Sequence, residues 1–262
     1  MVAVLLPGMA QKDDIKQIRI AVLQMIHKAK EGHIPSAFSV IEILYTLYAA
    51  MEKDDVFFLS KGHASAGLYA VLAHFGFLRK EDLDTFCKYD SKLGGHPHLK
   101  VPHIMNSSGS LGHGFPAAAG YALAKKIKGE PGRVFCLIGD GESNEGTIWE
   151  TAMYGEQLKL NNLVCIVDNN KSQTRAMTSV NLEDKFRAFG WKAASVDGHD
   201  LQAVLNSLFN DEVRKSPGPV CIVANTIKGK GVKIMETDMF SWHHKAPTDE
   251  ELAAFTKEII NG

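Results

Sequence analysis

The stretch VFCLIGDGESNEG, residues 134–146, decides the fold. Its first five residues form a continuous apolar run of strand length, and two glycines then flank Asp140. Strands that lack polar alternation belong to sheets that are covered on both faces. The stretch therefore predicts a buried strand that ends in a glycine-rich loop, with a helix beginning near Gly146.

Similar apolar runs occur elsewhere in the chain, and helical patterns separate them. Strands are predicted at residues 56–59, 163–167, 191–196 and 220–224, and helices at 148–158, 186–189 and 201–208. Strands that alternate with helices imply parallel pairing through right-handed crossovers. We therefore expect an α/β fold, with a doubly wound, mostly parallel sheet flanked by helices.

The first half of the chain predicts a helical part that precedes most of the strands. Apolar residues recur at helical spacing over residues 13–30, 68–75 and 82–86, and Ser39 is expected to cap a helix that runs to about Met51. Residues 90–116 predict long loops, and Pro116 is placed to begin an alanine-rich helix that ends at Lys128. Because no linker or repeat is visible, we expect residues 1–262 to form a single domain.

Composition excludes several classes of protein. Lys and Arg number 29 against 30 Asp and Glu, so no basic excess favours nucleic acid. No apolar run approaches the length of a membrane span, and residues 1–7 lack the charged start of a signal peptide. The four cysteines lie far apart, which favours free thiols in a reducing compartment. We expect a cytoplasmic protein that binds neither membrane nor nucleic acid.

The loops after the predicted strands carry oxygen ligands. Ligands of an open parallel sheet bind at the carboxyl ends of its strands, where Asp140 and Asn170 should meet. Carboxylate and amide oxygens suit a hard cation such as Mg²⁺, but two side chains are too few for a closed cage. A phosphorylated cofactor should complete the shell, and the glycines beside Asp140 allow its close approach. Lys228, in a third such loop, either approaches the phosphates or is exposed.

Other phosphate-binding motifs fit less well. A dinucleotide fingerprint would need glycine where Asn144 stands, and no Gly-Lys-Ser or Gly-Lys-Thr of a P-loop occurs. Five of the eleven histidines follow a glycine, namely His33, His63, His96, His113 and His199. Imidazoles on such loops suit proton transfer near neutral pH. His199 is interpreted as structural, and a zinc site at His96, His98 and His103 is disfavoured because no cysteine or acidic ligand accompanies it.

The span from Gly139-Asp140-Gly141 to Asn169-Asn170 resembles the cofactor motif of thiamine-diphosphate-dependent enzymes. Within that superfamily the chain resembles the transketolase family over nearly its whole length, in six pieces that occur in the family's order. These pieces are residues 31–33, 59–64, 95–97, 109–112, the diphosphate motif itself, and 243–247.

The resemblance implies roles for individual residues. Asp140, Asn170 and the carbonyl of Ser172 would hold Mg²⁺ or Ca²⁺, and Gly141 would donate its N–H to the diphosphate. The resemblance places His63 and His244 at the diphosphate and reacting centre, His33 and His96 at the donor end of the substrate channel, and Gly109, Ser110 and Leu111 against the aminopyrimidine ring. Glu145 would correspond to a carboxylate that pairs across the dimer interface and links the two active sites. The cofactor would supply an ylid that attacks a ketose carbonyl.

The resemblance covers only the diphosphate-binding domain of a transketolase. The pyrimidine-binding and C-terminal domains, with the glutamate that activates the cofactor, are expected on a separate C-terminal subunit. We expect a heterotetramer that is inactive without this partner and transfers a two-carbon ketol unit between sugars or sugar phosphates. Two departures bear on the donor: Ile34-Pro35-Ser36 replaces the common Pro-Gly, and His113 stands where glutamine is usual.

Two other functions stay open at this point. One is a different thiamine-dependent reaction, such as that of a 2-oxo acid dehydrogenase α-subunit or a deoxyxylulose phosphate synthase. The pieces at residues 60–63 and 95–97 favour transketolase over these. The other is a non-catalytic subunit that binds cofactor for regulation, which the intact Asp140, Asn170, His63 and His244 disfavour.

Overall fold

The computed structural model of the chain describes residues 9–175, 177 and 181–262. Within them lies one sheet of five parallel strands in the order β1-β2-β3-β5-β4. The strands are β1 (Val56–Leu59), β2 (Val134–Gly139), β3 (Leu163–Asn169), β4 (Lys192–Asp197) and β5 (Val220–Asn225). The predicted α/β class is confirmed, and every predicted strand is present. Residues 1–7, interpreted above as no signal peptide, lie outside the described residues.

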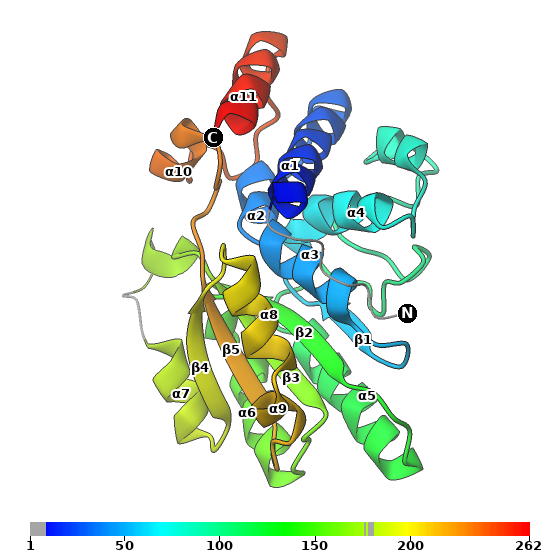
Figure 1. Ribbon diagram of the computed structural model, residues 1–262, viewed down its shortest axis with the longest axis vertical. Helices are drawn as coiled ribbons and strands as arrows, with labels where there is room; N and C mark the ends of the chain where they lie inside the picture. The colour runs from blue at the N-terminus through cyan, green and yellow to red at the C-terminus, as the bar shows by residue number, and fades with distance from the viewer. Residues whose placement is uncertain (1–8, 176, 178–180) are drawn as a thin grey trace.

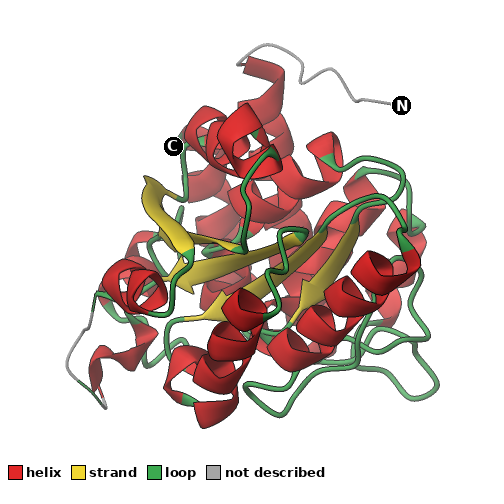
Figure 2. Cartoon of the chain, turned by 90° about the horizontal axis from the view of Figure 1, so that it is seen from below, coloured by secondary structure: helices red, strands yellow, loops and turns green. Residues whose placement is uncertain are grey.

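Helices cover both faces of the sheet (Figure 2). Successive residues of the buried strands alternate between two apolar clusters, so that Phe135 and Leu137 face one layer while Cys136 and Ile138 face the other. The first layer contains α1 (Met9–Ala29), α2 (Ile34–Phe38), α3 (Ile41–Ala50), α4 (Ser65–His74) and α8 (Leu201–Phe209). The second contains α5 (Gly114–Lys128), α6 (Gly146–Gln157) and α7 (Leu182–Ala188). This is the doubly wound arrangement that the continuous apolar runs predict.

The parallel register brings the loops that follow the strands to one edge of the sheet. Gly139 pairs with Asp168, and Asn169 pairs with Asn225, so the chain leaves β2, β3 and β5 at the same level. Beyond this edge the chain continues from β5 into α10 (Lys233–Thr237) and α11 (Asp249–Asn261) (Figure 1). The short helices η1 (Gly62–Ala64), η3 (Glu142–Asn144) and η4 (Ser172–Arg175) follow β1, β2 and β3.

Several helices begin or end differently from the prediction. Val40, not Ser39, is the N-cap of α3, because Ser39 is fully buried and its hydroxyl donates to the Ser36 carbonyl at 3.2 Å and to Asp168. The alanine-rich helix begins at Gly114, two residues before Pro116. The helical pattern at residues 82–86 corresponds to the short helix η2 (Lys80–Thr85). Helices α2, α9 (Asp211–Arg214), α10 and α11 were not predicted.

All four cysteines are free thiols, as predicted. Cys136, Cys165 and Cys221 are buried at neighbouring positions of β2, β3 and β5, while Cys87 is half-buried. No helix in the described part of the chain is both long and apolar enough to cross a membrane.

Candidate active site

A buried network at the carboxyl edge of the sheet centres on Asp168, whose side chain is fully enclosed. The carboxylate forms an ion pair with Lys61 and accepts hydrogen bonds from Thr226 Oγ1, from Ser39 Oγ at 2.7 Å and from Asn170 Nδ2 at 2.9 Å. These partners come from the loops after β1, β3 and β5 and from the turn before α3. The network therefore fixes the relative positions of the loops that form the site.

Asp140 and Asn170 lie on adjacent loops, as the sequence predicts. Asp140 is 1% exposed and accepts hydrogen bonds from the N–H of Gly141 at 2.8 Å and of Gln173 at 3.4 Å, which joins the loops after β2 and β3. Asn170 Oδ1 accepts from the N–H of Ser172 at 3.0 Å and from its hydroxyl at 2.5 Å. The two predicted side-chain ligands and Ser172 thus belong to one pair of connected loops.

The electrostatics of this pair fit a cation. Burial, and then the nearby Asp168 carboxylate, raise the pKa of Asp140 above its ordinary value. Two buried carboxylates repel each other, and a bound cation would remove both the repulsion and the desolvation cost. The oxygen donors on these loops are those that Mg²⁺ and Ca²⁺ prefer. A cation bound by Asn170 would take the Oδ1 atom that Ser172 now contacts.

Of the two expectations for Lys228, the exposed position is wrong. It is only 3% exposed, and its Nζ lies 3.1 Å from Nδ1 of His243. Burial and the neighbouring Lys61 lower the pKa of Lys228 to about 8, while Asp140 and Asp168 act in the opposite direction. Lys228 therefore faces the same site as the two carboxylates.

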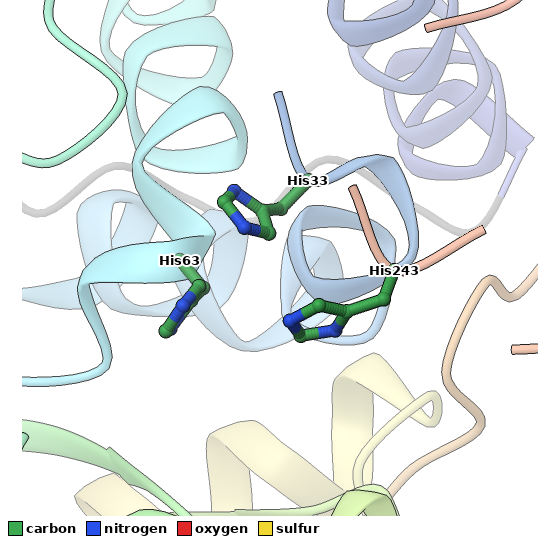
Figure 3. A group of neighbouring side chains, drawn as sticks. All are labelled: His33, His63 and His243. Atoms are coloured by element: carbon green, nitrogen blue, oxygen red, sulfur yellow. The ribbon is translucent and has the colours of Figure 1, made fainter. Parts of the chain in front are cut away.

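Five histidines gather beside the cation site. The ring centroid of His33 lies 4.6 Å from that of His63, 4.5 Å from His244, 5.2 Å from His243 and 6.2 Å from His96. Figure 3 shows His33, His63 and His243 converging from three different segments, namely the turn before α2, the helix η1 and the loop between α10 and α11. The four histidines that the resemblance singled out are thus brought together, and His243 joins them.

The cluster favours neutral imidazoles. Burial, followed by the proximity of His63, lowers the pKa of His33 to about 3. Burial and His96 lower the pKa of His63 to about 4. At neutral pH both rings are uncharged, so each has one nitrogen that can accept a hydrogen bond and one N–H that can donate one.

Close backbone packing requires the glycine that precedes His63. A Cβ atom built on Gly62 would lie 2.6 Å from Ser108 Oγ and 2.7 Å from a ring carbon of His96. Glycine therefore allows the loop after β1 to lie against the segment that carries residues 106–112. His63 and His96 owe their 5.2 Å ring separation to this approach.

Glu142 anchors the loop of Gly109, Ser110 and Leu111. Its buried carboxylate accepts the N–H groups of Gly112 and Gly139, each at 3.0 Å, and the Ser60 hydroxyl at 2.5 Å. The loops after β1 and β2 and the turn before α5 are therefore held by one side chain. Ser110 and His113 are both exposed, with Ser110 Oγ 3.2 Å from His113 Nδ1.

Glu145 has a different environment from the other predicted residues. It is the N-cap of α6, and its side chain is exposed. Within the described part of the chain, its carboxylate has no hydrogen bond or ion pair. Such an acidic group is available to a partner from another chain.

His199 has the structural surroundings that the sequence analysis expected. Its Nδ1 lies 3.2 Å from Glu42, which also binds Arg19 at 2.8 Å, and its Nε2 accepts the N–H of Ile227 at 2.8 Å. His103, part of the disfavoured zinc set, instead lies against Phe77 with ring centroids 4.3 Å apart.

Sequence reasoning missed Lys61, Asp168, Glu142 and His243. Lys61 lies in the piece at residues 59–64 and Asp168 in the diphosphate motif. The order of residues does not show that these two side chains are buried and form an ion pair. His243 is adjacent to His244, and that doublet was the available signal.

The comparisons with known proteins agree with this fold and show the family of the chain. Residues 10–260 match the family model described as transketolase, thiamine diphosphate binding domain. The chain is 35% identical to one of the subunits of the apulose-4-phosphate transketolase of Phocaeicola vulgatus, over 92% of this chain and 90% of that protein. It is 37% identical to the 6-deoxy-6-sulfo-D-fructose transketolase subunit SqwG of a Clostridium species, over 92% and 93%.

A solved transketolase structure has the same fold as this chain. The transketolase of Campylobacter jejuni superposes with a TM-score of 0.87 at 25% identity, covering 97% of this chain and 43% of that one. The fold and the site define a thiamine-diphosphate-binding α/β domain. The chain belongs to the transketolase family, in which it corresponds to the N-terminal, cofactor-binding part and resembles the subunits of split enzymes.

Proposed function

We propose that this chain is the diphosphate-binding subunit of a two-chain transketolase that moves a two-carbon ketol unit from a ketose donor to an aldose acceptor. The observation that carries the proposal is the meeting of the Asp140 and Asn170 loops with the histidine cluster at one sheet edge. One side of this site suits a metal-bound diphosphate, and the other suits proton transfer. The family membership supports the same conclusion.

Each side of the site has its own task. Asp140, Asn170 and the Ser172 carbonyl would hold Mg²⁺ or Ca²⁺, Gly141 would donate its N–H to the diphosphate, and Lys228 would add a positive charge. Gly109, Ser110 and Leu111 would contact the aminopyrimidine ring of thiamine diphosphate. When bound, the cofactor supplies the carbon nucleophile that the reaction needs.

The histidines would orient the sugar and move its protons. His63 and His244 would serve the diphosphate and reacting centre, and His33 and His96 would line the channel that admits the donor. Because the pKa values of His33 and His63 are low, both rings are neutral at the working pH and can accept or donate hydrogen bonds with the sugar hydroxyls. The departures at Ile34-Pro35-Ser36 and at His113 would tune the donor, since Ile34, Pro35 and Ser36 directly follow His33.

The proposed partner is a second chain that carries the pyrimidine-binding domain. Two relatives of similar length are named as transketolase subunits, and the chain spans 43% of the Campylobacter transketolase. The exposed and unpaired Glu145 of the described chain supports pairing across an interface between two copies. We propose a cytoplasmic heterotetramer with two chains of each kind.

Reconstitution tests the proposal. The purified chain is mixed with its partner chain, thiamine diphosphate and Mg²⁺, and ketol transfer is followed with apulose 4-phosphate and 6-deoxy-6-sulfofructose as donors. These donors come from the names of the two relatives. Transfer is expected with the mixture and with neither chain alone. Decarboxylation of pyruvate, or no transfer from any ketose donor, would contradict the proposal.

A variant separates catalysis from regulation. Asp140→Ala removes the carboxylate proposed for the cation and should abolish transfer, whereas Asp211→Ala, which removes a 79% exposed carboxylate on α9, should leave it unchanged. Unaltered turnover of the Asp140→Ala complex would instead identify a non-catalytic subunit.

A further inference from the structure

Three histidines of the cluster lie in the geometry of a second kind of metal site. One nitrogen from each of His33, His63 and His243 lies within 4.8 Å of the other two. Zn²⁺ binds imidazole nitrogens at about 2.0–2.1 Å, which places tetrahedral ligands roughly 3.4 Å apart. The three rings therefore need to close by about 1.4 Å at most, a movement that side-chain rotation supplies.

The nitrogens of these rings are available. In the described residues, no protein group hydrogen-bonds to a ring nitrogen of His33 or His63. Nδ1 of His243 contacts Lys228, which leaves Nε2 as the ligand atom, and Figure 3 shows the His243 ring directed toward His63. His243 is exposed, so an ion can enter from solvent.

The ligand chemistry distinguishes this site from the one at Asp140. Imidazole nitrogens favour Zn²⁺, Cu²⁺ and Ni²⁺, whereas carboxylate and amide oxygens favour Mg²⁺. Lys61 is paired with Asp168, but Lys228 stands beside His243 and opposes a dication. The site should therefore bind a transition metal with moderate affinity and leave Mg²⁺ unbound.

We infer that His33, His63 and His243 form a binding site for a divalent transition-metal ion, with Zn²⁺ as its ligand. Water, or the nearby His244, whose ring centroid is 4.5 Å from that of His33, completes the shell. A consequence rests on the proposed function: because His33 and His63 also serve the reacting sugar, an ion held here blocks ketol transfer. Zinc would then inhibit the enzyme reversibly.

Metal binding is tested on the full chain, stripped with a chelator and kept without thiamine diphosphate. Calorimetric titration with Zn²⁺ should show one ion per chain, and Co²⁺ should give a visible absorption band of nitrogen ligation. His33→Asn and His243→Asn should each weaken Zn²⁺ binding by at least about tenfold. His98→Asn, which alters an exposed histidine outside the cluster, should not change it, and an excess of Mg²⁺ should not displace the Zn²⁺.

Circular dichroism checks that each variant folds, and if His33→Asn does not, His243→Asn on its exposed loop decides. Absence of Zn²⁺ binding, or binding unaffected by both substitutions, overturns the inference. In the reconstituted complex, the Zn²⁺ concentration that halves ketol transfer should rise at least about tenfold for His243→Asn. A wild-type complex that is inactive without Zn²⁺ would contradict the proposed function. The calorimetric result would still decide whether the metal site exists.

Discussion

Burial and the neighbouring histidines together lower the pKa of His33. It lies between four other imidazoles, so a proton on its ring would meet repulsion as well as desolvation, and its pKa falls to about 3. No carboxylate among the described residues contacts the ring to offset this. Burial and the grouping of these imidazoles therefore keep the His33 ring neutral.

This grouping predicts a pH dependence of stability. An unfolded histidine has a pKa near 6.5, so between about pH 6.5 and pH 3 the unfolded state binds more protons than folded His33 does. The free energy of unfolding should therefore fall as the pH drops through this window, and less so in His33→Asn. Urea unfolding of both proteins at pH 7 and pH 5 measures the difference. Equal losses of stability in the two proteins would contradict the pKa shift.

At the scale of single residues, the sequence predicts the proposed ligands better than it predicts the buried residues that hold their loops in place. Asp140, Asn170 and His63 occupy motif positions, and their chemistry is legible from residue type. Glu142 and Asp168 were not singled out, because their roles depend on burial and on donors that arrive from distant segments. Only the assembled loops show that these two carboxylates hold the site together.

At the scale of elements, the ion pair between Lys61 and Asp168 joins the segment after β1 to the end of β3. The two side chains are 8% and 0% exposed, and Lys61 Nζ also donates to the Ser36 carbonyl at 3.1 Å, which brings in α2. One buried pair thus connects three elements that lie far apart in the sequence.

Removing one partner of this pair should be costly. Lys61→Met leaves Asp168 buried without its counter-charge, so we expect a loss of roughly 3–5 kcal/mol in the free energy of unfolding. Lys215→Met is the matched control, because Lys215 and its partner Asp211 are 76% and 79% exposed and their pair is worth less than about 1 kcal/mol. Equilibrium denaturation checks both. Similar losses in the two variants would show that the buried pair has no special role.

The helices and strands differ in how strongly their local sequence predicts them. Strands β2, β3 and β5 were predicted because a continuous apolar run of this length has few other uses in a soluble fold. Helix α2 has only five residues, too few for periodicity to show. Helix α11 was missed although Thr248 and Glu251 form a capping box, a local signal that was present in the sequence.

At the scale of the whole molecule, an apolar surface remains open on α6. Met153, Tyr154 and Leu158 are 50%, 57% and 41% exposed. Exposed apolar residues grouped on one helix are typical of surfaces that another chain covers. The fold could be predicted from one sequence, whereas a surface that another chain would cover leaves no trace in the apolar pattern of that sequence.

Assembly should depend on this surface. Tyr154→Asp places a charge in it and should reduce association in the mixture of the two subunits by at least about tenfold, since buried aromatic side chains contribute strongly to interfaces. Tyr89→Asp is the control, because Tyr89 is 96% exposed on a loop away from α6. Light scattering after size-exclusion chromatography gives the masses. Unchanged assembly of Tyr154→Asp would place the interface elsewhere.

The central claim is that the loops after β2 and β3 together bind the cation and diphosphate of thiamine diphosphate. A crystal structure of the reconstituted complex with thiamine diphosphate and Mg²⁺ tests it most directly. We predict the ion bound by oxygens of Asp140, Asn170 and Ser172, with the diphosphate beside Gly141. A diphosphate bound elsewhere, or an ion that contacts neither Asp140 nor Asn170, would contradict the account.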